Sequence, residues 1–87
     1  MIIIEPHTLE RAIERGTNEN EIVDVIRNGI DGSAKKGRLL KYKIFVFNNY
    51  RNNKYYKQKK VEVIFSKEGM NIYTVTVYVY YGIWEEM

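Results

Sequence analysis

The stretch NIYTVTVYVYY, from Asn71 to Tyr81, decides the fold that this sequence predicts. Its side chains alternate between valines and residues that carry a hydroxyl group. Because successive residues of a strand point to opposite faces of a sheet, the pattern predicts one apolar face and one hydroxyl face. The β-branched and aromatic content is also typical of a strand. The valine set is Val75, Val77 and Val79, and the hydroxyl set is Thr74, Thr76, Tyr78 and Tyr80.

Two short helices are predicted ahead of this strand. The first runs from His7 to a stop at Gly16, since glycine is a common helix terminator. The second begins at Asn18, whose side chain suits an N-cap, and ends at Gly29. The residues expected to face the sheet are Leu9, Ala12 and Ile13 in the first helix, and Ile22, Val23 and Ile26 in the second.

Two further strands are predicted, over residues 38–47 and 54–66, with a loop of Asn-rich sequence between them and a glycine-rich loop before them. Residues 1–5 contain three isoleucines, but the sequence leaves open whether they join the sheet. Helices that precede a run of strands indicate an α+β domain. The predicted fold is two N-terminal helices packed on one face of an antiparallel sheet of three to four strands.

Length and composition limit the classes of protein that fit. The 87 residues suffice for a single domain over 1–87 with one modest core, and 45% hydrophobic content is typical of a folded chain. The absence of cysteine excludes disulfide bonds and thiolate metal sites. No apolar run approaches membrane-spanning length, so we expect a cytoplasmic protein without membrane contact.

Charge is distributed unevenly along the chain. The net charge is +3, yet residues 35–60 contain ten bases and no acid, whereas the segments on either side are acidic. A block of this kind repels itself unless a polyanion or an acidic protein lies nearby. The sequence therefore predicts RNA, and an acidic protein, as partners.

One helical stripe carries candidate catalytic residues. His7, Arg11 and Arg15 are spaced four apart and so share one side of the first helix. Histidine is the side chain that titrates near neutral pH, and guanidinium groups hold phosphate oxygens. The alternative is a solvated helix face on which Glu10 and Glu14 balance the arginines.

Basic residues alternate with tyrosines over residues 50–60. Lysine and arginine attract phosphate, and tyrosine rings stack on unpaired bases, so this segment favours binding of single-stranded nucleic acid. The alternative is an edge strand that lysines protect from aggregation. With two lysines of the preceding strand, the candidate RNA-binding residues are Lys41, Lys43, Arg51, Lys54, Tyr55, Tyr56, Lys57, Lys59 and Lys60.

These residue types fit RNA cleavage without a metal ion. Such a reaction needs a base for the 2′-hydroxyl, an acid for the leaving oxygen and cations for the phosphate. His7 and the two arginines supply the base and the cations, next to the hydroxyl face. With one histidine, the second proton-transfer group must be a tyrosine, a lysine or a group of the substrate assembly. One histidine, no cysteine and no acidic pair at ligand spacing argue against a metal nuclease, so no metal or cofactor is expected.

The segment HTLERAIERG from His7 to Gly16 and the run VTVY from Val75 to Tyr78 resemble an uncharacterised family of small prokaryotic domains. That family opens with a histidine, an arginine four residues on and an Arg-Gly pair before a second helix. It closes with a strand that reads apolar-Thr-apolar-Tyr. It is placed near the RelE-like toxins, within the barnase–EndoU–colicin–RelE group of metal-independent ribonucleases.

The resemblance implies roles for His7, Arg11, Arg15, Thr76 and Tyr78 in cleavage. It implies an endoribonuclease toxin of the toxin–antitoxin or contact-inhibition type, in which the 2′-hydroxyl of mRNA or tRNA attacks the phosphodiester. An acidic antitoxin or immunity protein would neutralise it. Unlike RelE-like proteins proper, this sequence predicts no C-terminal helix and concentrates its bases in the middle strands, which leaves ribosome dependence and the RNA target open.

Two other functions fit the same residues. A non-catalytic module would bind RNA or DNA through the basic, tyrosine-rich sheet surface. A structural or interaction domain would use the hydroxyl face and Trp84 for assembly.

Overall fold

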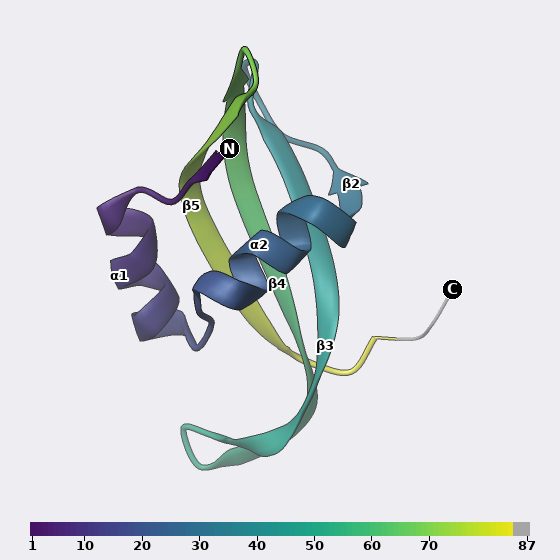
Figure 1. The fold of residues 1–87 in the computed structure, drawn as a ribbon. Coiled ribbons are helices and arrows are strands. Elements are labelled where there is room, and N and C mark those ends of the chain that lie inside the picture. The colour runs from purple at the N-terminus through teal and green to yellow at the C-terminus, as the bar shows by residue number, and fades with distance from the viewer. Residues whose placement is uncertain (85–87) are drawn as a thin grey trace.

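The computed structural model describes residues 1–84 and shows two helices beside one twisted sheet (Figure 1). Within this range the sheet has five strands in the order β1-β5-β4-β3-β2. β1 pairs with β5 in parallel, and the other neighbours are antiparallel. In chain order the elements are β1 (Ile2–Ile3), α1 (Pro6–Arg15), α2 (Glu19–Asn28), β2 (Ile30–Gly32), β3 (Leu39–Arg51), β4 (Lys54–Glu68) and β5 (Asn71–Gly82).

The α+β class is confirmed, but the prediction of a purely antiparallel sheet of three to four strands is wrong. Ile2 and Ile3 pair in parallel with Ile72 and Tyr73, which adds a strand outside β5. At the opposite edge, β2 pairs with β3 inside the segment expected to be a loop. Both additions are two or three residues long, too short for alternation to reveal them in the sequence.

The β3–β4 hairpin extends further than predicted. Its turn is limited to Asn52 and Asn53, which have φ values of 52° and 67°. Asparagine tolerates this left-handed conformation, and a two-residue turn of this kind matches the twist of the flanking strands. The two strands consequently continue beyond the body of the sheet as a ribbon, residues 48–57, that we call the hairpin arm (Figure 1).

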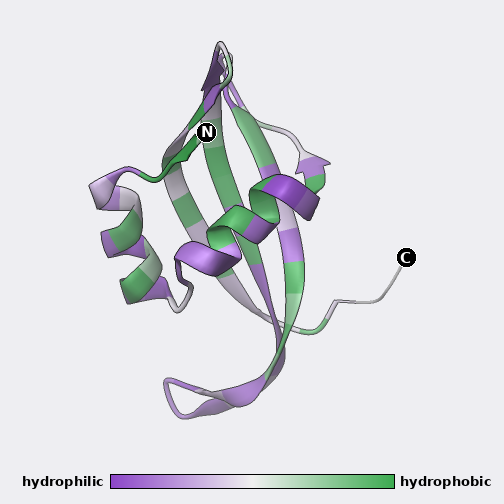
Figure 2. Ribbon diagram, in the orientation of Figure 1, coloured by the Kyte–Doolittle hydropathy of each residue, from purple (hydrophilic) through white to green (hydrophobic). Residues whose placement is uncertain are grey.

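Both helices pack on one face of the sheet, as predicted. α2 lies over β3 and β4, and α1 lies along β5. Figure 2 shows the hydrophobic part of β4 beneath α2, and a largely hydrophilic hairpin arm.

Neither helix in residues 1–84 has the length and apolarity needed to cross a bilayer. The buried apolar residues are Ala12, Ile22, Val25, Ile26, Val61, Val63, Phe65 and Val77. We call the opposite side of the sheet the open face.

The inward faces of the helices differ from the prediction. In α1 the buried residues are Thr8 and Ala12, whereas Ile13 is 79% exposed. In α2, Val25 is fully buried and Val23 only half-buried. Because α1 lies at the edge of the sheet and not over its centre, the helix turns Thr8 toward β5, and the prediction of Ile13 as a core residue is wrong.

A bulge in β5 explains why one threonine is misplaced. Ile64 pairs with Thr76 but Phe65 pairs with Thr74, so Val75 has no partner on β4. An extra residue in one strand reverses the alternation beyond it, which moves Thr74 to the helix side. There it is 2% exposed, accepts a hydrogen bond from the Glu5 amide and donates one to the Thr8 hydroxyl, both at 3.0 Å. Its assignment to the hydroxyl face is wrong.

Thr74→Val should destabilise the fold, because it removes this hydroxyl without changing the side chain's shape. The Glu5 amide and the Thr8 hydroxyl would each lose a partner, and an unsatisfied buried polar group costs about 1–3 kcal/mol. Urea denaturation measures the free energy of unfolding. Thr76→Val, on the open face, is the matched control and should change it by less than about 0.5 kcal/mol. Equal effects of the two variants would contradict the buried role of Thr74.

Candidate functional site

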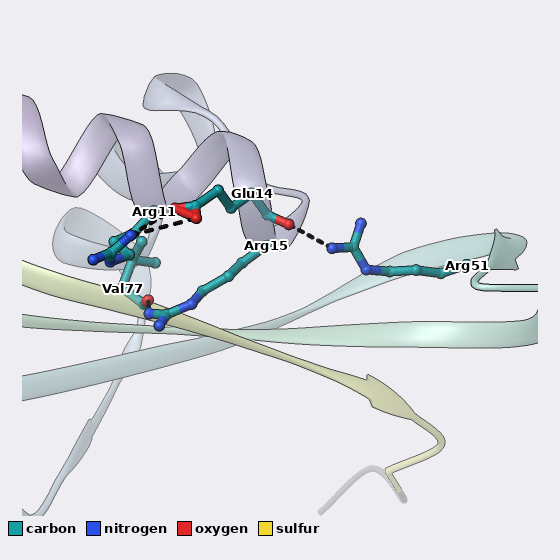
Figure 3. Close-up of polar contacts among 5 residues, drawn as sticks. All are labelled: Arg11, Glu14, Arg15, Arg51 and Val77. Carbon is teal, nitrogen blue, oxygen red and sulfur yellow. Dashed lines mark hydrogen bonds and ion pairs between the residues drawn. The ribbon is translucent and has the colours of Figure 1, made fainter.

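The outer edge of β5 is the place where α1 meets the sheet. β1 pairs only with Ile72 and Tyr73, at the start of β5. Further along β5, two backbone carbonyl oxygens on this edge form hydrogen bonds with side chains of α1. His7 Nε2 lies 2.6 Å from the oxygen of Val75, and Arg15 Nη1 donates to the oxygen of Val77, also at 2.6 Å. Figure 3 shows Arg15 extending from α1 to Val77. Thr76 lies between the two anchored positions.

The contact with Val75 fixes the tautomer of His7. A carbonyl oxygen can only accept a hydrogen bond, so Nε2 must carry the proton. In the neutral ring, Nδ1 is then the acceptor, and it belongs to an exposed side chain. The strand backbone thus orients a ring whose remaining nitrogen is able to accept a proton.

Arg15 also contacts Tyr78. Its guanidinium carbon lies 5.0 Å from the centre of the Tyr78 ring, a cation–π distance, and Tyr78 is 38% exposed on the open face. Arg11, one helical turn before Arg15, forms an exposed ion pair with Glu14 at 2.7 Å. The structure therefore groups His7, Arg15, Thr76 and Tyr78 along one strand edge, and it places Arg11 on the same helix with its charge paired.

The residues predicted to bind RNA do not form one surface. The register of β3 with β4 places some of them on the helix side and others on the open face. Tyr55, Lys54 and Lys57 are exposed, and Tyr56 is half-buried. The helix side has Lys41, Lys43 and Lys59, the open face has Lys60, and the hairpin arm has Arg51, Lys54, Tyr55, Tyr56 and Lys57.

Three of the sheet's side chains bind the C-terminal carbonyl groups of α1, and we call them the collar. A helix leaves its last carbonyl oxygens without internal partners, and its dipole favours cations there. The collar binds two of these oxygens and the oxygen of Gly16, the C-cap residue that follows α1, and Figure 3 shows one contact, from Arg51 to Glu14. The contacts are Arg51 Nη2 to the Glu14 oxygen at 2.7 Å, Tyr81 Oη to the Arg15 oxygen at 2.6 Å, and Lys59 Nζ to the Gly16 oxygen at 2.8 Å.

The sequence did not single out Tyr81. The available signal was its position in the alternation, because it falls on the same side as Val77 and Val79 and not with the other tyrosines. Burial raises the pKa of its hydroxyl, so Tyr81 stays protonated and able to donate at neutral pH. Arg51 adds to this contact, since its guanidinium lies 5.0 Å from the Tyr81 ring centre.

Acids of α2 neutralise lysines of the sheet. Lys59 Nζ lies 2.8 Å from a carboxylate oxygen of Glu21, and Lys43 Nζ lies 2.6 Å from one of Asp24. The hydrogen bond from Lys43, followed by one from Asn28, lowers the pKa of Asp24 below its ordinary value. Part of the basic block is therefore balanced by the acidic helix of the same chain.

The part of the chain described, residues 1–84, contains no group of three His, Cys, Asp or Glu side chains that could hold a metal ion. No family model, curated protein or solved structure matches this chain. Its function must therefore be inferred from the geometry of its own residues.

Proposed function

We propose that this chain is a metal-independent endoribonuclease that cleaves at the edge of β5. The observation that supports the proposal is the shared anchoring of His7 and Arg15 on two carbonyls that flank Thr76. Positions two residues apart on a strand are separated by at most about 7 Å, so the points at which the proton acceptor and the cation are anchored lie within reach of one phosphodiester. Each of the two side chains lies more than sixty positions in the sequence from the carbonyl that it contacts.

The chemistry follows from these positions. His7 Nδ1 takes the proton of the 2′-hydroxyl, and the 2′-oxygen attacks the phosphorus. The bond from phosphorus to the 5′-oxygen breaks, which leaves a 2′,3′-cyclic phosphate and a 5′-hydroxyl. Tyr78 is the proposed proton donor to the leaving oxygen, because its ring contacts the Arg15 guanidinium and its hydroxyl group is therefore close to the phosphate site. The Arg15 guanidinium stabilises the charge on the non-bridging oxygens.

Arg11 is a second cation for the phosphate. Its ion pair with Glu14 is exposed on both sides, and exposed pairs contribute only about 0–1 kcal/mol. A phosphate group can therefore replace Glu14 as the partner of Arg11 at little cost. While RNA is absent, Glu14 neutralises the charge of Arg11.

A toxin of this kind requires an inhibitor, and we propose an acidic antitoxin or immunity protein. Lysines of the hairpin arm and of the loop before β3 remain exposed, including Lys35, Lys36, Lys54 and Lys57. Charge complementarity to these residues would favour fast association. The inhibitor would need to cover the β5 edge as well.

A second candidate function is RNA binding without cleavage. The bonds of His7 and Arg15 to β5 also act as a cover for an exposed strand edge, which proteins protect against unwanted pairing. If His7 and Arg15 only protect this strand edge, the chain binds RNA through its basic surfaces and does not cleave it.

One assay separates the two functions. Purified protein is incubated with total RNA in excess EDTA, and RNA length is followed by gel electrophoresis. We expect shortened RNA with 2′,3′-cyclic phosphate ends. Intact RNA that is retarded in a gel shift would favour the binding module, and intact RNA without retardation would overturn both proposals.

A further inference from the structure

The open face presents side chains in regular rows, and most of them are aromatic or aliphatic. Strand register determines these rows, because residues paired across three strands point to the same side. Neither α1 nor α2 covers them. From β5 across β4 to β3 the rows are Tyr80–Lys60–Ile44, Tyr78–Glu62–Tyr42 and Thr76–Ile64–Leu40.

Lys60 lies at the centre of an aromatic cluster on this face. Its ammonium group is 5.1 Å from the ring centre of Tyr42 and 5.8 Å from those of Tyr80 and Trp84. The backbone amide of Trp84 donates to the Gln58 side chain at 2.6 Å, which holds the indole beside the cluster. Tyr80 is 47% exposed, so at least one ring is accessible to a ligand.

Positive charge lies at two edges of this aromatic surface. Arg15 reaches the open face at Tyr78. Beyond the third row, a surface hollow of about 470 Å³ has Ile64 in its lining. The same hollow is lined by Lys35, Lys36 and Arg38, from the loop before β3. Glu62 is the acid in the rows, and it pairs with Lys60 at 3.5 Å.

We propose that the open face is a platform on which unpaired bases of single-stranded RNA stack. Exposed rings on a sheet stack on bases regardless of sequence, while neighbouring cations hold the phosphates. Bases inside a duplex have their faces occupied by other bases, so duplex RNA cannot use this surface. The platform residues are Tyr42, Lys60, Tyr78, Tyr80 and Trp84.

The role of the platform in the reaction rests on the proposed ribonuclease function. If that function holds, the platform makes single-stranded RNA the substrate. Tyr78 belongs both to the second row and to the β5 edge, where Arg15 covers its ring. A single RNA strand whose bases stack on the rows of the open face would therefore reach the β5 edge, where His7 is anchored. Binding itself needs no cleavage and is measured separately.

Trp84 provides a direct readout, because it is the only tryptophan in the chain. Titration uses a 2′-O-methyl RNA oligonucleotide, which has no free 2′-hydroxyl and cannot be cleaved, either single-stranded or annealed to its complement. We expect the single strand to quench Trp84 fluorescence and to bind at least about tenfold more tightly than the duplex. Equal affinity for the two forms would overturn the platform.

Variants locate the binding surface. Removal of one stacking ring weakens binding by roughly 5- to 150-fold, which is the expected result for Tyr80→Ala and Tyr42→Ala. Tyr80→Phe keeps the ring and should bind normally, and circular dichroism checks that each variant is folded. Tyr55→Ala tests the competing surface, the hairpin arm, whose Tyr55 is a candidate RNA-binding residue, and on the platform proposal it should weaken binding much less than Tyr80→Ala. Weaker binding by Tyr55→Ala, with the alanine variants of the platform unchanged, would place the RNA on the arm and overturn the proposal.

The two proposals fail in different ways. If the uncleavable single strand quenches Trp84 but ordinary RNA stays intact, the platform stands and the ribonuclease proposal fails. If ordinary RNA is cut but the uncleavable single strand and its duplex bind with equal affinity, the ribonuclease stands and the platform fails.

Discussion

His7→Ala should lose at least about 100-fold of the RNA-cleavage rate, since a positioned general base contributes typically 10²–10⁴-fold. Binding of the uncleavable single strand should stay within about twofold of the wild type, because His7 lies at the edge and not among the platform residues. The fold should also survive. His7 is exposed, and the Val75 oxygen that it releases can bond to water, which limits the loss to about 1 kcal/mol.

His7→Gln is the control that separates catalysis from edge protection. A glutamine amide can donate to the Val75 oxygen, but it cannot take a proton from a 2′-hydroxyl. We therefore expect His7→Gln to be as inactive as His7→Ala in single-turnover cleavage of a labelled oligonucleotide. Full activity of the glutamine variant would show that His7 only covers the strand edge.

Lys59→Met should lower the free energy of unfolding by about 2–3 kcal/mol. Lys59 is only 8% exposed, and its ammonium group holds both the Glu21 carboxylate and the Gly16 oxygen. Methionine fills similar space without the charge, which leaves Glu21 with the Thr17 hydroxyl as its remaining partner. Breaking a fully buried ion pair costs about 3–5 kcal/mol, and the partial exposure of Glu21 reduces that cost. Urea denaturation provides the measurement.

Lys57→Met is the matched control two residues away on β4. Lys57 is exposed, so this change should alter the free energy of unfolding by less than about 0.5 kcal/mol. If Lys57 contacts a phosphate, its loss should reduce the salt dependence of RNA binding by about one counterion. The opposite pattern, a stable Lys59→Met variant with weakened RNA binding, would assign Lys59 to RNA and not to the fold.

The last strand shows what local sequence can and cannot predict. The alternation of Val77, Tyr78 and Val79 placed these residues on the correct faces, because each side chain points away from its neighbour whatever the partner strand. The bulge at Val75 depends on register with β4, which local alternation does not record. Thr74 consequently turned from an expected surface hydroxyl into a buried one.

The candidate site was predictable in part. Four-residue spacing put His7, Arg11 and Arg15 on one side of a helix, as the structure has them. Their meeting with β5 was not predictable, since it depends on which face of α1 turns toward the sheet. That choice favours the small Ala12 and the hydrogen-bonded Thr8 over Ile13. The ten bases of residues 35–60 were equally visible, but the pairing of Lys43 and Lys59 with acids of α2 depends on tertiary contacts.

The collar has a consequence for the order in which the molecule assembles. α1 has ten residues, too few for a helix to be stable alone in water. Its end is held by Arg51, Lys59 and Tyr81, which lie on three different strands and up to sixty-six residues away. We therefore expect α1 to settle after the β3–β5 meander has formed. During synthesis, the lysines of β3 and β4 would leave the ribosome before β5, and the proposed site at the β5 edge would form only after β5 has emerged.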